Sequence, residues 1–332
     1  MTSQRRVLSI WIWIYVVFSV FWVIGASPIG AEEGYTNRDD LFSISFVNQQ
    51  NGWACGRWGT ILHTVDGGKT WNMQDSGVRY TLGGICFTDD KNGWAVGNMG
   101  TIIHTSDGGK TWMEQESPVD FYHMDVYFAS PLKGWIVSEQ THILHTQDGG
   151  KTWEVQFSDE DYILKSISFH GETHGFAVGE FGHTYRTIDG GKNWDKQAGR
   201  AEINDIGDLE GEPYLFDVAM IDENTAWAVG IEGRVIMTED GGNTWSSVET
   251  GSPNTQLFSI SFNQDKALVI AGKGVCLISE NLGQTWRHAV FDPKIDYTWI
   301  YAVESLDASH FMTCGEDGGM YVGNLGHFKK VR

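Results

Sequence analysis

Basic residues are scarce in this sequence of 332 residues. Lysine and arginine together number 23, against 43 aspartates and glutamates, which leaves a formal net charge of −20. Binding to nucleic acid phosphates requires concentrated lysine and arginine, and adsorption to anionic lipid requires the same charge. The composition therefore excludes both classes of partner, and we expect no nucleic-acid ligand.

Paired cysteines are also absent, since none of the four cysteines lies in a Cys-x-x-Cys motif. The usual sequence evidence for a zinc or thioredoxin-like site is therefore missing. Cys55, Cys86, Cys276 and Cys314 all lie in apolar strand patterns, which predicts small buried hydrophobic residues. Cys55 and Cys314 occupy the same position in the first and last repeats, so a disulfide between them stays open as an alternative, although strand centres of adjacent units are usually too far apart. We predict no metal site and no cofactor.

The chain has one long apolar run, Val7–Ile24, which follows two arginines and precedes small residues that end at Ala31. A charged start, an apolar stretch and small residues are typical of a secretory signal peptide, and the run is also nearly long enough to span a bilayer. Residues 1–31 are predicted as a signal peptide or an N-terminal membrane anchor, and residues 32–40 as a linker. The remainder is expected in a periplasmic, lumenal or extracellular compartment, held to the membrane by residues 7–24 if the leader is kept.

An eight-residue phrase recurs through the rest of the chain, first as Thr64-Val-Asp-Gly-Gly-Lys-Thr-Trp. A weaker sixth copy starts at Ser279, and a seventh unit keeps only a front half around Gly318. The tryptophans that close the six copies are spaced 41, 41, 41, 51 and 41 residues apart. A regular period of this length predicts stacked supersecondary units, as in propellers and solenoids.

Each unit contains four segments with the pattern of short strands. The first unit shows Phe42-Ser-Ile-Ser-Phe, then Gly52-Trp-Ala-Cys-Gly, then Thr60-Ile-Leu-His-Thr, and a fourth segment that opens at Thr70. Alternation with a period of two predicts strands, and small residues on one face of the first segment fit an innermost strand near an axis. The fold class is therefore all-β: a seven-bladed β-propeller of four-stranded antiparallel blades over residues 41–332.

The repeated phrase has a structural interpretation. Its aspartate can accept hydrogen bonds from backbone N–H groups of its own turn, the second glycine permits positive φ, and the tryptophan packs over the hairpin. We expect these residues to be structural rather than catalytic. They are Asp66, Trp71, Asp107, Trp112, Asp148, Trp153, Asp189, Trp194, Asp240, Trp245, Asn281 and Trp286.

A column of histidines, His63, His104 and His145, precedes the first three turns. These residues lie on third strands, and strands are spaced about 4.8 Å apart, so equivalent atoms of adjacent blades should be roughly 10 Å apart. A shared metal requires ligand distances of about 2 Å. We therefore expect these histidines to support the turns.

The longer phrase Asn92-Gly-Trp-Ala-Val-Gly-x-x-Gly-Thr-Ile-Ile-His-Thr-x-Asp-Gly-Gly-Lys-Thr-Trp resembles the Asp-box, or bacterial neuraminidase, repeats of the photosystem II assembly and stability factors, and of their relatives in non-photosynthetic bacteria. The resemblance covers about residues 41–326. It implies a non-enzymatic, lumenal seven-bladed propeller that binds an early reaction-centre intermediate. The partner would be a subunit of a membrane complex, with no small-molecule substrate, and the protein a monomer.

That family is known for an arginine-rich patch, from which this chain departs. After Ala31 its arginines form no local run, and they are Arg38, Arg57, Arg79, Arg186, Arg200, Arg234, Arg287 and Arg332. Photosystem binding itself is therefore not carried over from the resemblance. A relative with a different client in a non-photosynthetic bacterium is an equal alternative.

A partner is expected on the loops that enter each inner strand and that join the second strand to the third. Aromatic residues and arginine anchor interfaces, and they recur in these loops. The predicted partner-binding residues are Arg57, Trp58, Arg79, Tyr80, Tyr122, Tyr162, Phe181, Tyr214, Tyr297 and Trp299. The alternative is that the rings cap the ends of the blade core. Ten extra residues within Ala198–Pro213 form either a further binding element or a solvated loop.

A secreted sialidase-like or other glycoside hydrolase is the main rival, because sialidases also carry Asp-boxes. Such an enzyme needs three arginines around the substrate carboxylate, a tyrosine nucleophile and acidic partners. Arg57, Arg79 and Arg234 are the candidates for the arginines, but no Phe/Tyr-Arg-Ile-Pro segment precedes the repeats. A sortilin-like peptide receptor is the third hypothesis, and such a receptor would have more blades and disulfides. The sequence therefore favours binding over catalysis.

Overall fold

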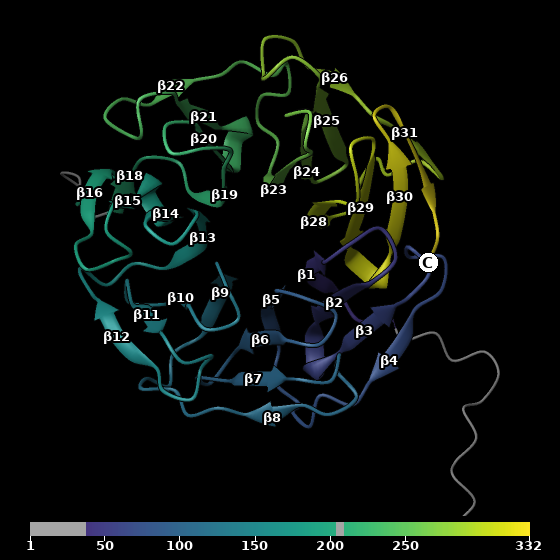
Figure 1. The fold of residues 1–332 in the computed structure, drawn as a ribbon. Coiled ribbons are helices and arrows are strands. Elements are labelled where there is room, and N and C mark those ends of the chain that lie inside the picture. The colour runs from purple at the N-terminus through teal and green to yellow at the C-terminus, as the bar shows by residue number, and fades with distance from the viewer. Residues whose placement is uncertain (1–37, 204–208) are drawn as a thin grey trace, which may run out of the picture. The chain divides into compact units, whose positions relative to one another are not determined.

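The computed structural model describes residues 38–203 and 209–332, which form seven sheets around a central axis (Figure 1). The predicted leader, residues 1–31, and most of the predicted linker lie outside the described residues. Within the described ranges, no helix is both long and apolar enough to cross a membrane. The all-β propeller with seven blades is confirmed.

Each blade is built from strands that are consecutive in the sequence, and these strands follow one another in order from the axis to the outside. Blades 1 to 3 contain β1 (Leu41–Phe46), β2 (Gly52–Gly56), β3 (Ile61–Thr64), β4 (Asn72–Gln74), β5 (Leu82–Phe87), β6 (Gly93–Gly97), β7 (Ile102–Thr105), β8 (Met113–Glu114), β9 (His123–Phe128), β10 (Gly134–Ser138), β11 (Ile143–Thr146) and β12 (Glu154–Phe157). Blades 4 to 6 contain β13 (Leu164–His170), β14 (His174–Gly179), β15 (Thr184–Thr187), β16 (Asp195–Ala198), β19 (Leu215–Met220), β20 (Ala226–Gly230), β21 (Val235–Thr238), β22 (Ser246–Ser247), β23 (Leu257–Phe262), β24 (Leu268–Gly272), β25 (Val275–Ser279) and β26 (Arg287–His288).

The seventh blade differs from the other six because it has five strands. It contains β28 (Ile300–Ser305), β29 (His310–Gly315), β30 (Met320–Asn324) and β31 (His327–Lys330), and β27 (Val290–Asp292) pairs in parallel with β31. Phe291 on β27 stacks on Phe328 with ring centroids 4.8 Å apart, which attaches the added strand to the blade. The prediction of four strands holds for six blades, and the fifth strand of the seventh covers the edge of its last repeat strand.

The ring closes by packing and not by exchange of a strand, since blade 1 and blade 7 are separate sheets in the described residues. The Asp40 carboxylate accepts a hydrogen bond from the backbone N–H of Asp317 at 2.9 Å. Leu41 and Ile44 of blade 1 share a buried cluster with Met312 and Cys314 of blade 7. Residues 38–40 therefore contribute side chains to the closure and no strand.

The core lies between neighbouring blades, where a tryptophan of the second strand is stacked in each of blades 1 to 3. Trp53 lies 3.6 Å from the Phe87 ring of blade 2 and 4.5 Å from the His63 ring of its own blade, measured between ring centroids. Trp94 and Trp135 repeat the sandwich in the next two blades. The column of histidines therefore packs on buried indoles, whereas the sequence suggested a role in the turns.

The ten extra residues of the fifth interval form a short hairpin between β16 and β19. Its strands are β17 (Ala201–Ile203) and β18 (Leu209–Gly211), which pair antiparallel. The backbone N–H of Arg200 donates to the Phe181 carbonyl at 3.2 Å, which ties the base of the hairpin to the loop between β14 and β15. The insertion thus lies at the same end of the propeller as the predicted binding loops.

Candidate binding face and central channel

The aspartates of the repeated phrase are bound within their own turns. In blade 1, Asp66 accepts hydrogen bonds from the Thr70 backbone N–H at 2.9 Å and from the Thr70 hydroxyl at 2.6 Å. The Thr64 hydroxyl donates to Asp66 at 2.8 Å and accepts from the Gly68 N–H at 2.9 Å. The hydrogen bonds from Thr70 lower the pKa of Asp66 to about 2. Each carboxylate therefore stabilises one hairpin, and the turns of different blades share no cavity.

The loops between second and third strands form the opposite end of the propeller. In every blade the first N–H of this loop donates to a carbonyl just before the inner strand; examples are Arg57 to Asp40, Asn98 to Thr81 and Glu180 to Ile163, each at 3.0 Å. Because the hairpin turns join third strands to fourth strands, they lie at the other end. Loop and turn residues thus occupy separate faces, referred to below as the loop end and the turn end.

Half of the predicted partner-binding residues project from the loop end into solvent. Trp58, Tyr80 and Tyr297 are 70%, 50% and 83% exposed, and Arg79 is exposed as well. Arg57 is half exposed and forms an ion pair with Asp40 at 2.9 Å. Aromatic residues and arginine are enriched at protein interfaces relative to the rest of the surface. These five residues have the accessibility that a binding role requires.

The other five predicted residues are half-buried, and four of them, Tyr162, Phe181, Tyr214 and Trp299, pack on neighbouring rings. Tyr162, Phe181 and Tyr214 form a continuous contact, with centroid distances of 5.5 Å and 4.9 Å between successive rings. Trp299 stacks on Phe258 at 5.3 Å. Burial raises the pKa of Tyr122 to about 12. These rings match the alternative in which aromatic residues cap the blade ends.

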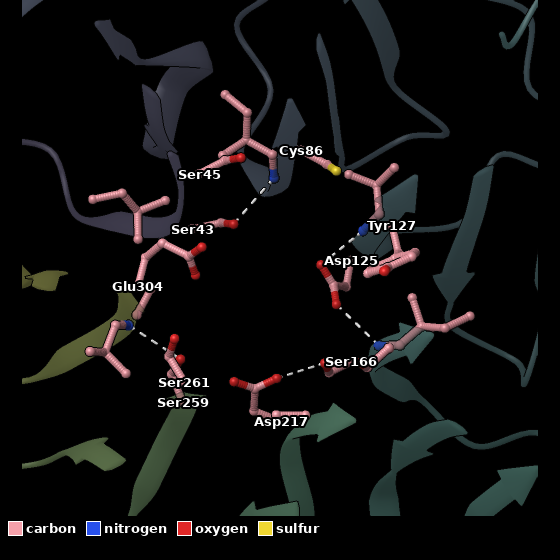
Figure 2. A pocket seen from close by; sticks show the side chains of 18 of the residues that line it. Ser43, Ser45, Cys86, Asp125, Tyr127, Ser166, Asp217, Ser259, Ser261 and Glu304 are labelled. Carbon is pink, nitrogen blue, oxygen red and sulfur yellow. Dashed lines mark hydrogen bonds between the residues drawn. The ribbon is translucent and has the colours of Figure 1, made fainter. Parts of the chain in front are cut away.

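A cavity of about 490 Å³ runs along the axis and is lined by the innermost strand of all seven blades (Figure 2). Serine, glycine, alanine and cysteine residues from the small face of the inner strands are among its lining residues, as the strand pattern predicted. Three carboxylates, Asp125, Asp217 and Glu304, and one ammonium, Lys165, also line it. In Figure 2 the three carboxylates extend into the open channel from different blades.

Polar side chains of the channel connect adjacent blades that share no ladder of backbone hydrogen bonds. Ser43 accepts from the Ile85 N–H at 3.2 Å, Asp125 from Ile167 at 3.1 Å and Asp217 from Ile260 at 2.8 Å. The same type of bond is made by Ser45, Ser168 and Ser259. These bonds satisfy backbone donors that would otherwise be unpaired near the axis. The channel serine pattern is thus part of the ring's stability.

The channel carboxylates are poorly stabilised as anions. Burial raises the pKa of Asp125 to about 7 and that of Glu304 to about 8, and the charge of Asp217 adds to both shifts. Burial also raises the pKa of Asp217, and it lowers the pKa of the Lys165 ammonium. Among the described residues, no three histidine, cysteine, aspartate or glutamate side chains come close enough to hold a metal ion.

Aromatic residues surround the mouth of the channel at the loop end. Tyr301 packs on Phe42 at 5.1 Å and on Phe258 at 5.5 Å, and Phe216 packs on Phe258 at 5.4 Å between centroids. The Lys273 ammonium lies 4.9 Å from the centroid of the Trp299 ring. Sequence reasoning searched the loops and missed this cluster, although Phe42, Phe216, Phe258 and Tyr301 share the second position of their inner strands.

The channel carboxylates were missed for a related reason. Asp125, Asp217 and Glu304 replace serine, glycine, alanine or cysteine on the small face of the inner strand. The departure from that pattern is visible in the sequence. The neighbouring residues of these strands still match the inner-strand pattern, so the three acidic side chains did not stand out as a group.

The family was identified by comparison with protein-family models. A model described as "Photosynthesis system II assembly factor YCF48" matches residues 35–115, 72–155, 112–204 and 197–326. The chain belongs to this family. The matched segments span all seven blades, and they include the repeated phrase on which the resemblance was based.

Among curated relatives of this family member, the photosystem II assembly lipoprotein Ycf48 of Synechococcus sp. (strain CC9902) is 27% identical over 122 residues. The match covers 36% of this chain and 36% of that protein, so the chain spans about a third of the length of the relative.

Several solved structures share the fold. The structure described as YCF48 bound to D1 peptide has a TM-score of 0.70 at 18% identity and covers 87% of this chain and 92% of its own. YCF48 from Cyanidioschyzon merolae has a TM-score of 0.69 at 20% identity, with coverage of 86% and 95%. A GH74 xyloglucanase from Xanthomonas campestris has a TM-score of 0.70 at 10% identity, with coverage of 89% and 55%. At these identities the three show a common fold.

Three arginines of this YCF48 family member, Arg57, Arg79 and Arg234, lie in loops of the loop end. Arg57 is paired with Asp40 at 2.9 Å, and Arg234 is paired with Glu212 at 2.6 Å. Arg79 is exposed between blades 1 and 2. Because two of the three carry a carboxylate partner, the loop end offers no concentrated positive field for an acidic ligand.

Proposed function

We propose that this chain is a non-catalytic, exported binding protein that acts in the assembly or stability of a membrane protein complex. The observation that carries the proposal is the family match over all seven blades. Its relatives include a photosystem II assembly lipoprotein and a YCF48 bound to a D1 peptide, so a subunit of a membrane complex is the proposed partner. The protein is proposed to act as a monomer, with Arg57, Trp58, Arg79, Tyr80 and Tyr297 as the contacting residues.

The hydrolase alternative rests on the shared fold with GH74 enzymes. Two features support a non-enzymatic role instead. The hairpin aspartates are bonded inside their own turns, and Arg57 and Arg234 are paired with separate carboxylates rather than directed at one point. Incubation of the purified protein with xyloglucan and with a fluorogenic sialoside is expected to give no product, and turnover of either would support the hydrolase.

Export is proposed from the leader, with Val7–Ile24 either removed or retained as an anchor. The Synechococcus relative is described as a lipoprotein. In this chain no cysteine precedes Cys55, so a lipid-bearing cysteine of the leader is not available. Retention of the apolar run is therefore the proposed means of membrane attachment, and release of the protein from membranes by alkaline carbonate would contradict it.

Capture from detergent-solubilised membranes of the source organism tests the binding role. The tagged full chain is expected to recover a defined membrane complex. The triple variant Trp58→Ala, Tyr80→Ala and Tyr297→Ala should lower the recovery by at least about tenfold, because exposed aromatic anchors carry a large share of interface energy. Capture should be quantified by mass spectrometry against wild type.

A matched control uses exposed apolar side chains on outer strands. Met73→Ala with Met113→Ala removes side chains that are 58% and 71% exposed on β4 and β8, and it should leave capture unchanged. Equal recovery by the aromatic triple variant would refute the binding face, and failure of the wild type to recover any complex would refute the assembly role.

A further inference from the structure

Two polar side chains of the channel remain outside the network of bonds between blades. Ser261 is 8% exposed, and within the described part of the chain its hydroxyl has no hydrogen-bond partner, although Ser45 and Ser168 at the same register each accept an N–H from the next blade. Glu304 forms neither a hydrogen bond nor an ion pair with any described residue. Both lie on adjacent strands, β23 and β28, and both line the cavity (Figure 2).

The ionisable groups around this pair are mostly acidic. Asp217 and Asp125 face the same cavity, and the Asp217 charge acts on Glu304. The one channel ammonium, Lys165, interacts electrostatically with Glu180 and Glu139 of the loop end. A narrow cavity with acidic walls concentrates the field and attracts cations. Three carboxylic acids thus face one ammonium in the channel, and a bound cation would favour their ionised forms.

The geometry favours an organic cation over a metal ion. The described residues contain no three ligand-type side chains close enough to share one ion. A guanidinium or ammonium group is larger and carries several N–H donors, so it can bond to Glu304 and Ser261 while Asp217 remains at a distance. The cavity of about 490 Å³ is within the range of pockets that bind small ligands, about 300–1,000 Å³.

The mouth of the channel has the chemistry that such a group needs on its way in. Phe258, Trp299 and Tyr301 surround the opening, and aromatic faces attract cations. Lys273 already places its ammonium 4.9 Å from the Trp299 ring, so these rings accept a cation in the structure itself. Apolar rings also provide a surface for the alkyl stem of an arginine or lysine side chain.

We propose that the central channel is a binding site for an alkylguanidinium or alkylammonium group, held by Glu304 and Ser261 within the field of Asp217 and Asp125. The site goes beyond the proposed function and is independent of it, because it uses the channel rather than the exposed loop rings. The group belongs either to a free amine or to an arginine or lysine side chain of a peptide.

Isothermal titration calorimetry on the full chain tests the site with three probes. Agmatine represents the free cation, a blocked Gly-Arg-Gly peptide represents the side chain, and the same peptide with citrulline is the uncharged control. At least one cationic probe should bind, and the citrulline peptide should not. Binding by agmatine alone assigns a free amine, and binding by the arginine peptide assigns a side chain. Absence of binding by both would overturn the proposal.

Variants connect the affinity to the named residues. Glu304→Gln is expected to weaken binding by about tenfold or more, because a charge-assisted hydrogen bond contributes about 1.5 kcal/mol or more, and Ser261→Ala should weaken it by a smaller factor. Glu232→Gln removes an exposed carboxylate of the loop end and is the matched control, with unchanged affinity. If Glu304→Gln binds as tightly as Glu232→Gln, the assignment is wrong.

A pH series supplies a readout that loss of folding does not mimic. The cation competes with a proton for Glu304, so wild-type affinity should increase from pH 6 to pH 9 and the Glu304→Gln affinity should increase less. The other titratable groups that face the cavity are Cys86, Asp125, Tyr127, Lys165, Asp217 and Tyr301. An affinity that does not change with pH in the wild type would contradict a role for Glu304.

Discussion

Carboxylates occur in two contrasting regions of this propeller, the hairpin turns and the central channel. In the turns, hydrogen bonds from Thr70 lower the pKa of Asp66 to about 2. In the channel, burial and the Asp217 charge raise the pKa of Glu304 to about 8. Asp66 thus has hydrogen-bond donors for its carboxylate oxygens, whereas Glu304 has none among the described residues.

The contrast distinguishes carboxylates that stabilise the fold from a carboxylate that is available to a ligand. The same threonine–aspartate bonds recur in blades 1, 2 and 3, around Asp66, Asp107 and Asp148. The bond is made again around Asp189 and Asp240, so it occurs in five blades, and both of its polar side chains have partners in each. The combination of Glu304 and Ser261 on adjacent inner strands occurs once in the ring. The polar groups of both side chains are open to the channel. Unrepeated and unsatisfied groups are therefore where a ligand is to be sought.

The largest expected effect comes from removing a hydroxyl in a hairpin turn. Thr146 is 2% exposed and accepts the Gly150 N–H at 2.8 Å while it donates to Asp148 at 2.9 Å. Thr146→Val leaves a buried N–H and a carboxylate oxygen without this partner, so it should lower the free energy of unfolding by about 1–3 kcal/mol. Urea denaturation measures the difference.

Ser261→Ala is the channel counterpart of this experiment. Its hydroxyl has no described partner, so the substitution should change the free energy of unfolding by less than about 0.5 kcal/mol. A loss as large as that of Thr146→Val would show that Ser261 is part of the architecture, and the distinction between the two regions would fail at this position.

The pH dependence of the free energy of unfolding is a second way to compare the turns with the channel, and the expected effect is somewhat smaller. The raised pKa of Glu304 means that the folded state holds a proton that the unfolded state, with an ordinary pKa of 4.5, has released. Stability from this group therefore falls as the pH rises from about 4.5 to about 8 and is constant above. The turn aspartates act in the opposite direction: Asp66 stabilises the fold above its ordinary pKa of 3.8, and this is lost as the pH falls toward 2.

Glu304→Gln isolates the channel contribution. At pH 9 the variant should be more stable than wild type by about 1–2 kcal/mol, since one pKa unit corresponds to about 1.4 kcal/mol. At pH 4.5 the two proteins should unfold at the same denaturant concentration. A variant that is less stable than wild type at pH 9 would mean that the ionised carboxylate is stabilised by an interaction that the structure does not contain.

The fold was predictable because each blade repeats the same local physics. The Gly-Gly turn, the alternating inner strand and the tryptophan period each indicate one hairpin or strand, and together they determine seven blades. The fifth strand of blade 7 was not predictable, because β27 lies in the segment that links blades 6 and 7 and its pairing with β31 is not part of the repeat pattern.

The candidate site was only partly predictable. The loop positions of Trp58, Tyr80 and Tyr297 could be read from the repeat, and all three are exposed. Whether a loop ring faces solvent or its neighbour depends on the packing of adjacent blades, as for Tyr162 against Phe181. The pairing of Glu304 with Ser261 depends on the angle between blades, which no single repeat encodes.

The smallest expected effect concerns the cysteines at the closure between the last and first blades. Cys55 and Cys314 are both free and buried, and each thiol points around the ring in the same direction: Cys55 Sγ lies 3.6 Å from the Leu82 carbonyl of blade 2, and Cys314 Sγ lies 3.7 Å from the Leu41 carbonyl of blade 1. Two side chains that each face the next blade do not face one another, so the disulfide left open by the sequence does not form in this structure.

Reductant should therefore leave the melting temperature of the purified protein unchanged, within about 1 °C. A disulfide that closes a chain segment this long would contribute about 2–4 kcal/mol, and its reduction would shift the melting temperature by several degrees. Thiol titration under denaturing, non-reducing conditions should detect all four cysteines. Detection of two thiols together with a reductant-sensitive melting temperature would mean that the ring is closed covalently, and hydrophobic packing between Leu41, Ile44 and Met312 would then be the lesser contribution to closure.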